Sequence, residues 1–178
     1  MIKHTDQRVG VFVDIQNLYH SAKHLYQARV NFKAILETAV AGRKLIRALA
    51  YVVRSQNVEE ENFFEALSKQ GFEVHMKDLQ VFYGGVKKAD WDVGLVVDAI
   101  RLSSKLDVVI LVTGDGDFLP LVEYLRNYGL IVEAVAFGRS ASSKLKEEVD
   151  NFIDLCQNEN KYLLKTKIRP IKRGSKDN

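Results

Sequence analysis

The stretch VTGDGDFLPLV, residues 112–122, decides the fold prediction because an apolar strand runs into an acidic loop there. The run DVVILV (107–112) before it is typical of a strand that is covered on both faces. After the loop, the apolar residues that follow Asp117, with Pro120 in the first turn, predict a helix. Asp115 and Asp117 therefore either cap this helix or hold a ligand, and the stretch alone leaves both interpretations open.

The rest of the chain alternates between strand and helix patterns. Runs rich in β-branched and aromatic residues predict strands at residues 9–14, 45–53, 72–76, 107–112, 130–137 and 152–155. Residues 79–85 could extend or pair with the third of these strands. Helical periodicity and capping residues predict helices at 17–27, 31–40, 58–70, 90–105, 117–127 and 142–149. This alternation indicates an α/β fold with a mainly parallel sheet covered on both faces.

Acidic residues follow two of the predicted strands. Asp14 ends the first strand, and Asp115 and Asp117 follow the strand that ends at Val112. In parallel α/β folds, ligands bind outside the carboxyl ends of the strands, so these carboxylates converge if the two strands are neighbours. Oxygen ligands without nearby His or Cys suit Mg²⁺ or Mn²⁺. Asn17 could cap the first helix, bind a phosphate, or do both. Gly114 and Gly116 would allow a positive φ or a close approach in the loop.

The segment KKADWDVGLVVDAI, residues 87–100, adds two candidate acids on one helix. Asp92 and Asp98 are six residues apart, which separates them by roughly 120° around the axis and ~9 Å along it. They are therefore not expected to bind one ion equally. Asp98 lies mid-helix among apolar residues, which a solvated first turn does not explain. Lys88 precedes the helix as a candidate phosphate contact.

Composition excludes several classes of protein. The longest apolar runs are far shorter than the roughly 20 residues of a membrane span, and the single cysteine, Cys156, favours a reducing cytoplasm. No glycine-rich dinucleotide or P-loop motif is present, and Gln16 counts against a phosphatase that uses Asp-x-Asp. Residues 165–178 hold six Lys or Arg and one acid, so the remaining 20 basic and 22 acidic residues give a net charge of −2. This basic tail either attracts polyanions or is only a solvated, disordered end.

Three motifs in this order resemble the NYN domain, a branch of the PIN-like nuclease superfamily, and most closely its LabA-like bacterial members. They are VFVDIQNL, KKADWDVGLVVDAI and VTGDGDFLPLVEYLRNYG, and the resemblance covers roughly residues 8–155. It departs mildly at Ile15 and Gln16, and at Thr113, where serine is common. The resemblance implies a PIN-like three-layer α/β/α sandwich formed by residues 1–164, with 165–178 as the tail.

The resemblance also implies a Mg²⁺- or Mn²⁺-dependent ribonuclease and assigns its residues. The expected catalytic residues are Asp14, Asp92, Asp98, Asp115 and Asp117, of which all but Asp92 are expected metal ligands; Asn17, Lys88 and Thr113 are expected to contact substrate. Arg139 and Lys144 are further candidate phosphate contacts, and Tyr83 and Trp91 either stack on bases or pack in the structure. The expected partner is single-stranded RNA, and a homodimer is left open. The alternative is a catalytically silent RNA-binding or regulatory module that kept the acidic pocket.

Overall fold

A parallel sheet forms the centre of the computed structural model, which describes residues 3–54, 58–78, 80–81, 87–88 and 91–164. Within these residues the sheet has six strands in the order β4-β3-β1-β7-β8-β9, and each neighbouring pair is parallel. The strands are β1 (Arg8–Asp14), β3 (Lys44–Arg54), β4 (Glu73–Asp78), β7 (Val108–Val112), β8 (Ile131–Ala136) and β9 (Asn151–Asp154). The first strand of the chain therefore lies in the middle of the sheet.

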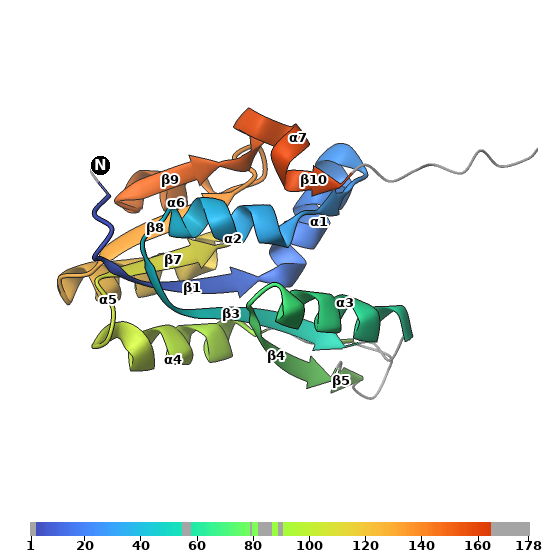
Figure 1. Cartoon of the computed structure of the whole chain (residues 1–178), viewed down its shortest axis with the longest axis horizontal. Coiled ribbons are helices and arrows are strands. Elements are labelled where there is room, and N and C mark those ends of the chain that lie inside the picture. Colours follow the sequence, from blue (N-terminus) through green and yellow to red (C-terminus); the bar gives the residue numbers. More distant parts are fainter. Residues whose placement is uncertain (1–2, 55–57, 79, 82–86, 89–90, 165–178) are drawn as a thin grey trace, which may run out of the picture.

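Helices cover both faces of this sheet (Figure 1). The helices are α1 (Ile15–Tyr26), α2 (Phe32–Val40), α3 (Val58–Lys69), α4 (Asp92–Ser103), α5 (Leu119–Asn127), α6 (Ser143–Glu148) and α7 (Glu159–Tyr162). One apolar core, which includes Leu18, Ile35 and Leu67, lies between the sheet and α1, α2 and α3. The other, which includes Leu95, Leu125 and Leu145, lies between the opposite face and α4, α5 and α6. The predicted α/β/α sandwich is confirmed, and its central sheet is parallel throughout.

Short strands lie outside the central sheet. β2 (Arg29–Val30) pairs antiparallel with β10 (Leu163–Leu164), and β5 (Gln80–Val81) pairs antiparallel with β6 (Lys87–Lys88). Of the segment 79–85, the structure describes Gln80 and Val81, which pair with β6 and not with the central sheet. Tyr83, the side chain of Lys88 and the predicted tail at 165–178 lie outside what the structure describes. No helix in the described part of the chain is long and apolar enough to cross a membrane.

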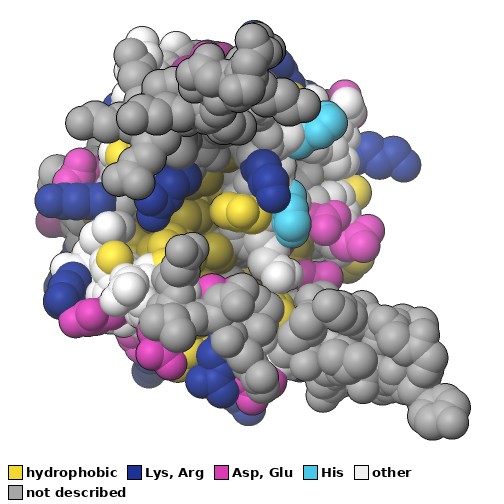
Figure 2. Space-filling view, turned by 90° about the vertical axis from the view of Figure 1, so that its right-hand side faces the viewer, with side chains coloured by type: hydrophobic (Ala, Val, Ile, Leu, Met, Phe, Trp, Pro, Cys, Tyr) yellow, Lys and Arg dark blue, Asp and Glu magenta, His cyan; other side chains and the backbone are white. Residues whose placement is uncertain are grey.

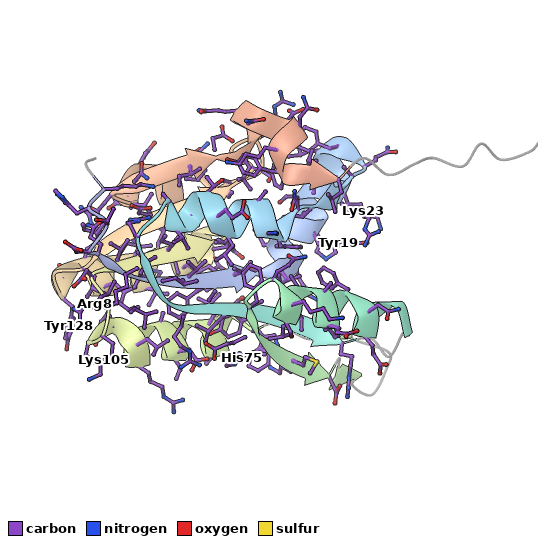
Figure 3. All side chains as sticks on the ribbon, viewed as in Figure 1. Arg8, Tyr19, Lys23, His75, Lys105 and Tyr128 are labelled. Atoms are coloured by element: carbon purple, nitrogen blue, oxygen red, sulfur yellow. The ribbon has the colours of Figure 1, made fainter. Side chains whose placement is uncertain are left out.

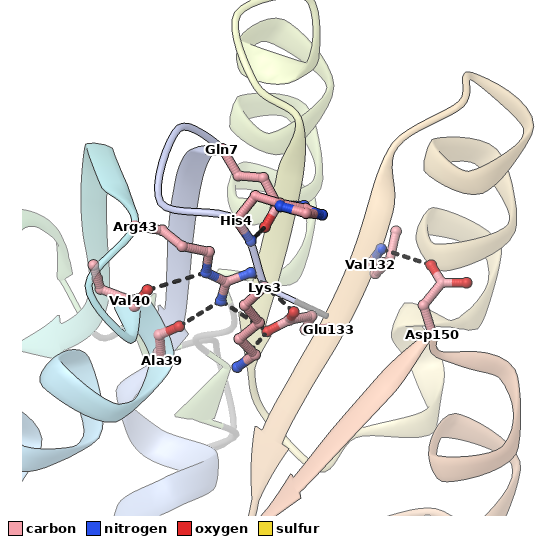
Figure 4. Close-up of polar contacts among 9 residues, drawn as sticks. All are labelled: Lys3, His4, Gln7, Ala39, Val40, Arg43, Val132, Glu133 and Asp150. Atoms are coloured by element: carbon pink, nitrogen blue, oxygen red, sulfur yellow. Dashed lines mark hydrogen bonds and ion pairs between the residues drawn. The ribbon is translucent and has the colours of Figure 1, made fainter. Parts of the chain in front are cut away.

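Two ion pairs fasten strands of the sheet to their surroundings away from the carboxyl edge. Arg43 and Glu133 are buried, with 4% and 0% of their surface exposed, and form two hydrogen bonds of 2.9 and 3.0 Å. Arg43 also donates to the carbonyls of Ala39 and Val40 (Figure 4). At the start of β1, Arg8 binds Asp107 just before β7, with an Nη2–Oδ1 distance of 2.7 Å. Both pairs lie away from the carboxyl edge of the sheet, where Arg54 at the end of β3 binds Asp78 at the end of β4.

Candidate functional site

Asp14 lies where β1 meets α1, at the edge of the sheet toward which the strand arrows of Figure 1 point. Its Oδ1 accepts a hydrogen bond of 3.0 Å from the backbone N–H of Asn17, so Asp14 is the N-cap of α1. Its Oδ2 accepts one of 3.3 Å from the Thr113 hydroxyl. The prediction that Asn17 caps this helix is wrong, because α1 begins at Ile15 and the carboxylate before it reaches the cap position first.

Asn17 instead joins α1 to the acidic loop. Its Oδ1 accepts a hydrogen bond of 2.9 Å from the backbone N–H of Gly114. The buried Thr113 hydroxyl accepts one of 3.2 Å from the N–H of Asp115 while it donates to Asp14. Because β1 and β7 are neighbours, these bonds form one polar network between the two strand ends. The structure therefore brings together Asp14, Asn17, Thr113 and Asp115 at the ends of β1 and β7.

Asp115, rather than Asp117, acts as a cap in the acidic loop. Asp115 Oδ1 accepts a hydrogen bond of 2.9 Å from the N–H of Asp117 and caps the 3₁₀ turn at Gly116–Phe118. The helix that follows, α5, begins only at Leu119. The prediction that Asp117 caps it is therefore wrong, because the intervening turn moves the helix start two residues on. Asp117 is exposed beside the network.

The loop glycines are required for a close approach rather than for a positive φ. Gly42, Gly71 and Gly129 are the described glycines with positive φ, and neither loop glycine is among them. A Cβ on Gly114 would lie 3.0 Å from the Cα of Ala141, and one on Gly116 would lie 2.8 Å from Ser142 Oγ. The acidic loop is thus pressed against the segment before α6, and Ser142 N–H donates to the carbonyl of Gly114 over 2.8 Å. This packing fixes the backbone that carries Asp115.

Burial raises the pKa of Asp14 above its ordinary value. Hydrogen bonds from Asn17 and Thr113 lower this pKa in part, and the charge of Asp115 raises it further. The Asp14 carboxylate is therefore an anion held in a place that disfavours negative charge. A bound cation would relieve that cost.

The donor set fits a cation that retains water ligands. Among the described residues, no three His, Cys, Asp or Glu side chains come close enough to hold one metal ion. Mg²⁺, however, usually keeps several waters and needs only one or two carboxylates together with substrate phosphates. Asp14 and Asp115, whose charges interact across the strand ends, supply such a pair with oxygen ligands only.

Asp98 contacts side chains of β3, β4 and its own helix. Its Oδ2 accepts a hydrogen bond of 3.0 Å from the hydroxyl of Tyr51, the residue paired with Asp14 across β1 and β3. His75 Nδ1 lies 3.6 Å from the same oxygen, and Arg101 lies 3.8 Å from Oδ1. Burial and the charge of Asp98 both raise the pKa of Tyr51, which keeps its proton on the hydroxyl. Asp98 thus binds a side chain of the strand next to β1, and it is not part of the hydrogen-bond network around Asp14.

The remaining candidates surround α4. Asp92 lies in the first turn of α4, partly buried. Trp91 packs against Tyr51 and His75, and its indole N–H donates to the carbonyl of Val52 over 2.8 Å. Of its two interpretations, packing is therefore the one observed. Lys144 is exposed on α6, and Arg139 lies over the ring of Tyr26 at 6.0 Å.

Sequence reasoning missed Tyr51, His75 and Asp154. Tyr51 and His75 lie within strand patterns that predicted only packing, and their contact with Asp98 needs three separate elements. Asp154 ends β9, and its Oδ1 accepts hydrogen bonds of 2.8 Å from the N–H groups of Gly138 and Cys156. Its place at the end of a predicted strand was a usable signal, of the kind that selected Asp14.

Together, the parallel sheet and this polar edge define an α/β protein whose acidic site joins the ends of two adjacent central strands. The chain belongs to the NYN domain family, whose model matches residues 8–156. It is 24% identical to the "Low amplitude and bright protein LabA" of Synechococcus elongatus over 83% of each chain, which agrees with the LabA-like branch. It also resembles the crystal structure of a protein of unknown function from Vibrio parahaemolyticus, with a TM-score of 0.82 and 32% identity. That similarity covers 92% of this chain and all of the Vibrio chain.

Proposed function

We propose that this chain is a metal-dependent ribonuclease that hydrolyses phosphodiester bonds of single-stranded RNA with Mg²⁺ or Mn²⁺. One observation carries the proposal: the partly buried Asp14, whose pKa is raised by burial and by Asp115, lies at the carboxyl ends of two adjacent strands. The NYN family, which belongs to a nuclease-like superfamily, supports the reaction class. A cytoplasmic location and a homodimer stay predictions.

Asp14 and Asp115 would hold the cation directly. Asp117 and Asp98, also expected as ligands, do not come close enough to join them around one ion and are proposed to act on its water ligands. A divalent cation at this position would neutralise the charge of a phosphodiester and favour ionisation of an attacking water. The hydrogen bond from Thr113 keeps the Asp14 carboxylate turned toward β7. The bond between Asn17 and Gly114 holds the loop of Asp115 against α1. These two contacts would preserve the geometry of both carboxylates before RNA binds.

The other polar groups would act on water and on the phosphate. Asp117 is exposed next to Asp115 and could accept a proton from the attacking water. Asp92, in the first turn of α4, is the second proposed group for orienting that water. Lys88 is proposed to contact the substrate phosphate. Asn17 and Thr113, which belong to the hydrogen-bond network at the ends of β1 and β7, are proposed to contact it as well.

A catalytically silent RNA-binding module is the second candidate function. The contacts of Asp98 favour this function, because its carboxylate already binds Tyr51, His75 and Arg101, which leaves it less available to a metal ion. In this case the acidic edge would be a structural junction that retains RNA without cleaving it.

The test is RNA cleavage by purified protein in the presence of Mn²⁺, with single-stranded and structured RNA as substrates. The comparison is the Asp14→Asn/Asp115→Asn variant, and the matched control is Asp6→Asn, an exposed acid at the opposite end of β1. Cleavage by the parent and Asp6→Asn alone supports the nuclease. Binding without metal-dependent cleavage supports the silent module, and equal cleavage by all three proteins identifies a contaminant and counts against the proposal.

A further inference from the structure

The exposed face of α1 carries positive charge and an aromatic ring next to the acidic site. Tyr19 is 45% exposed, and His20, Lys23 and His24 are exposed beside it. Together with Gln27, the two histidines and the lysine line a shallow depression on this helix. Residues 20, 23, 24 and 27 recur at the spacing of one helix face, so these groups form one continuous strip.

This strip is unusual in its charge. The chain has 23 acidic residues, yet none lies between Asp14 and Glu37. That interval contains Lys23, Arg29 and Lys33 in addition to the two histidines. Carboxylates near α1 therefore come from other elements, as Glu159 does beside Tyr26. The cations that α1 itself exposes attract a polyanion, because binding releases the counterions of its phosphates.

The strip also has the elements that recognise bases. The ammonium of Lys23 lies 5.7 Å from the centre of the Tyr19 ring, and His20 contacts the same ring edge-on at 5.5 Å. An exposed tyrosine beside a lysine matches the combination of stacking platform and phosphate contact found in proteins that bind single strands. Duplex RNA offers no unstacked base for such a platform.

Its position connects the strip to the candidate site. α1 begins at the residue after Asp14, so at a rise of about 1.5 Å per residue Tyr19 and Lys23 lie about 7.5 and 13.5 Å along the helix from Asp14. Ser21 hydrogen-bonds Ser140 over 2.9 Å, and the segment around Ser140 packs on the acidic loop through Ala141 and Ser142. Figure 2, viewed from this end of the molecule, shows an apolar hollow bordered by Lys, Arg and His side chains, with Asp and Glu side chains near them. Tyr19 and Lys23 project at the same end in Figure 3.

We propose that single-stranded RNA crosses this face of α1 on its way to the acidic site, with Tyr19 stacked on a base and Lys23, His20 and His24 contacting phosphates. The proposal rests on RNA being the substrate, as proposed above, and it adds the path by which the strand is held. It does not require that the site cleaves.

The chain contains a matched control surface. Tyr128 is 67% exposed and Lys105 is exposed, and both lie at the opposite end of the molecule (Figure 3). The experiment measures the affinity for a fluorescent oligouridylate by anisotropy in EDTA, where a metal-dependent site is inactive. It compares the parent with Tyr19→Ala/Lys23→Ala, with Tyr128→Ala/Lys105→Ala, and with Tyr19→Phe, after thermal unfolding shows that each is folded.

We expect the Tyr19→Ala/Lys23→Ala variant to bind at least about tenfold more weakly, since stacking and a charge contact are both lost. The slope of log affinity against log salt should fall by about 0.7 for the lost phosphate contact. Tyr19→Phe, which keeps the ring, and the control variant should bind like the parent. Equal weakening by both double variants, no weakening by the first, equal affinity for a duplex, or no binding by the parent would overturn the proposal. Binding that depends on α1 without cleavage in Mn²⁺ would instead defeat only the nuclease function.

Discussion

The amide oxygen of Asn17 accepts a hydrogen bond of 2.9 Å from the backbone N–H of Gly114, a residue 97 positions further along the chain. This contact joins the first turn of α1 to the loop that carries Asp115. Gly114 is buried, so its N–H has little access to water if the acceptor is removed. The relative position of Asp14 and Asp115 therefore depends on a side chain that carries no charge.

Asn17→Ala should lower both stability and activity. We expect a loss of about 1–3 kcal/mol in the free energy of unfolding, because a buried N–H loses its partner. Activity should fall further in Asn17→Ala than in Asn17→Ser, because serine retains an acceptor oxygen. Urea unfolding and the RNA cleavage assay measure the two effects. Unchanged stability in Asn17→Ala would contradict the assigned role of this bond.

Asp14→Asn should abolish metal-dependent cleavage and stabilise the fold. Burial raises the folded-state pKa of Asp14 above its ordinary value, so ionisation favours the unfolded chain. Stability is therefore lost as pH rises from the unfolded-state pKa through the raised folded-state pKa. The variant removes this loss and retains a good helix cap, since Asn and Asp cap about equally well.

Thermal unfolding at neutral pH measures that gain. Each kcal/mol gained in the free energy of unfolding corresponds to a rise of roughly 2–4 °C in Tm for a chain of this size. Asp6→Asn, at an exposed position, is the control and should stay within about 0.5 kcal/mol of the parent. A lower Tm for Asp14→Asn would show that its carboxylate is a net stabilising group.

Glu133→Gln should destabilise the protein severely. The carboxylate is fully buried against Arg43, and its replacement leaves a buried guanidinium without its counter-charge. We expect a loss of about 3–5 kcal/mol, whereas the Arg43→Met/Glu133→Leu variant should recover most of it. Urea denaturation measures both values, with the exposed Glu147→Gln as the control. If the double variant is no more stable than Glu133→Gln, the loss of stability in the single variant does not come from an uncompensated charge on Arg43.

The Arg8–Asp107 pair should stabilise the protein only above acidic pH. Hydrogen bonds from Arg8 lower the pKa of Asp107 from its ordinary 3.8 to about 2. The stabilisation is thus complete above the unfolded-state pKa and is lost as pH falls toward about 2. The difference in Tm between the parent and Asp107→Asn should shrink across this window, and it should be smaller at high ionic strength because the pair is exposed. A difference independent of pH would rule out ionisation as its source.

Local patterns predicted the elements of the fold well. The helices predicted at 31–40 and 58–70 depend on residues close together in the chain, and the structure has them at Phe32–Val40 and Val58–Lys69. The two-residue strands β2 and β10 were not predicted, because their pairing joins positions more than 130 residues apart that show no periodicity.

The sequence identified residues of the candidate site but not the contacts between them. The rule for strand ends selected Asp14 and Asp115, and the neighbouring positions of β1 and β7 brought them together. The exchanged caps were not predictable, because Asp14 and Asn17 are both good capping residues and only the exact helix start distinguishes them. The partners of Asp98 come from β3, β4 and α4, and no spacing in the sequence connects these elements.

The central position of β1 also affects how the protein is made. A ribosome that has released residues 1–54 has produced β1 and one neighbour, β3, but Asp14 still lacks Thr113 and the loop that carries Asp115. Asp14 and Asp115 come together only after the second half of the chain has been synthesised, because β7 pairs with β1. Truncated translation products that stop before Val112 would consequently carry no assembled centre, whatever reaction the finished polypeptide performs.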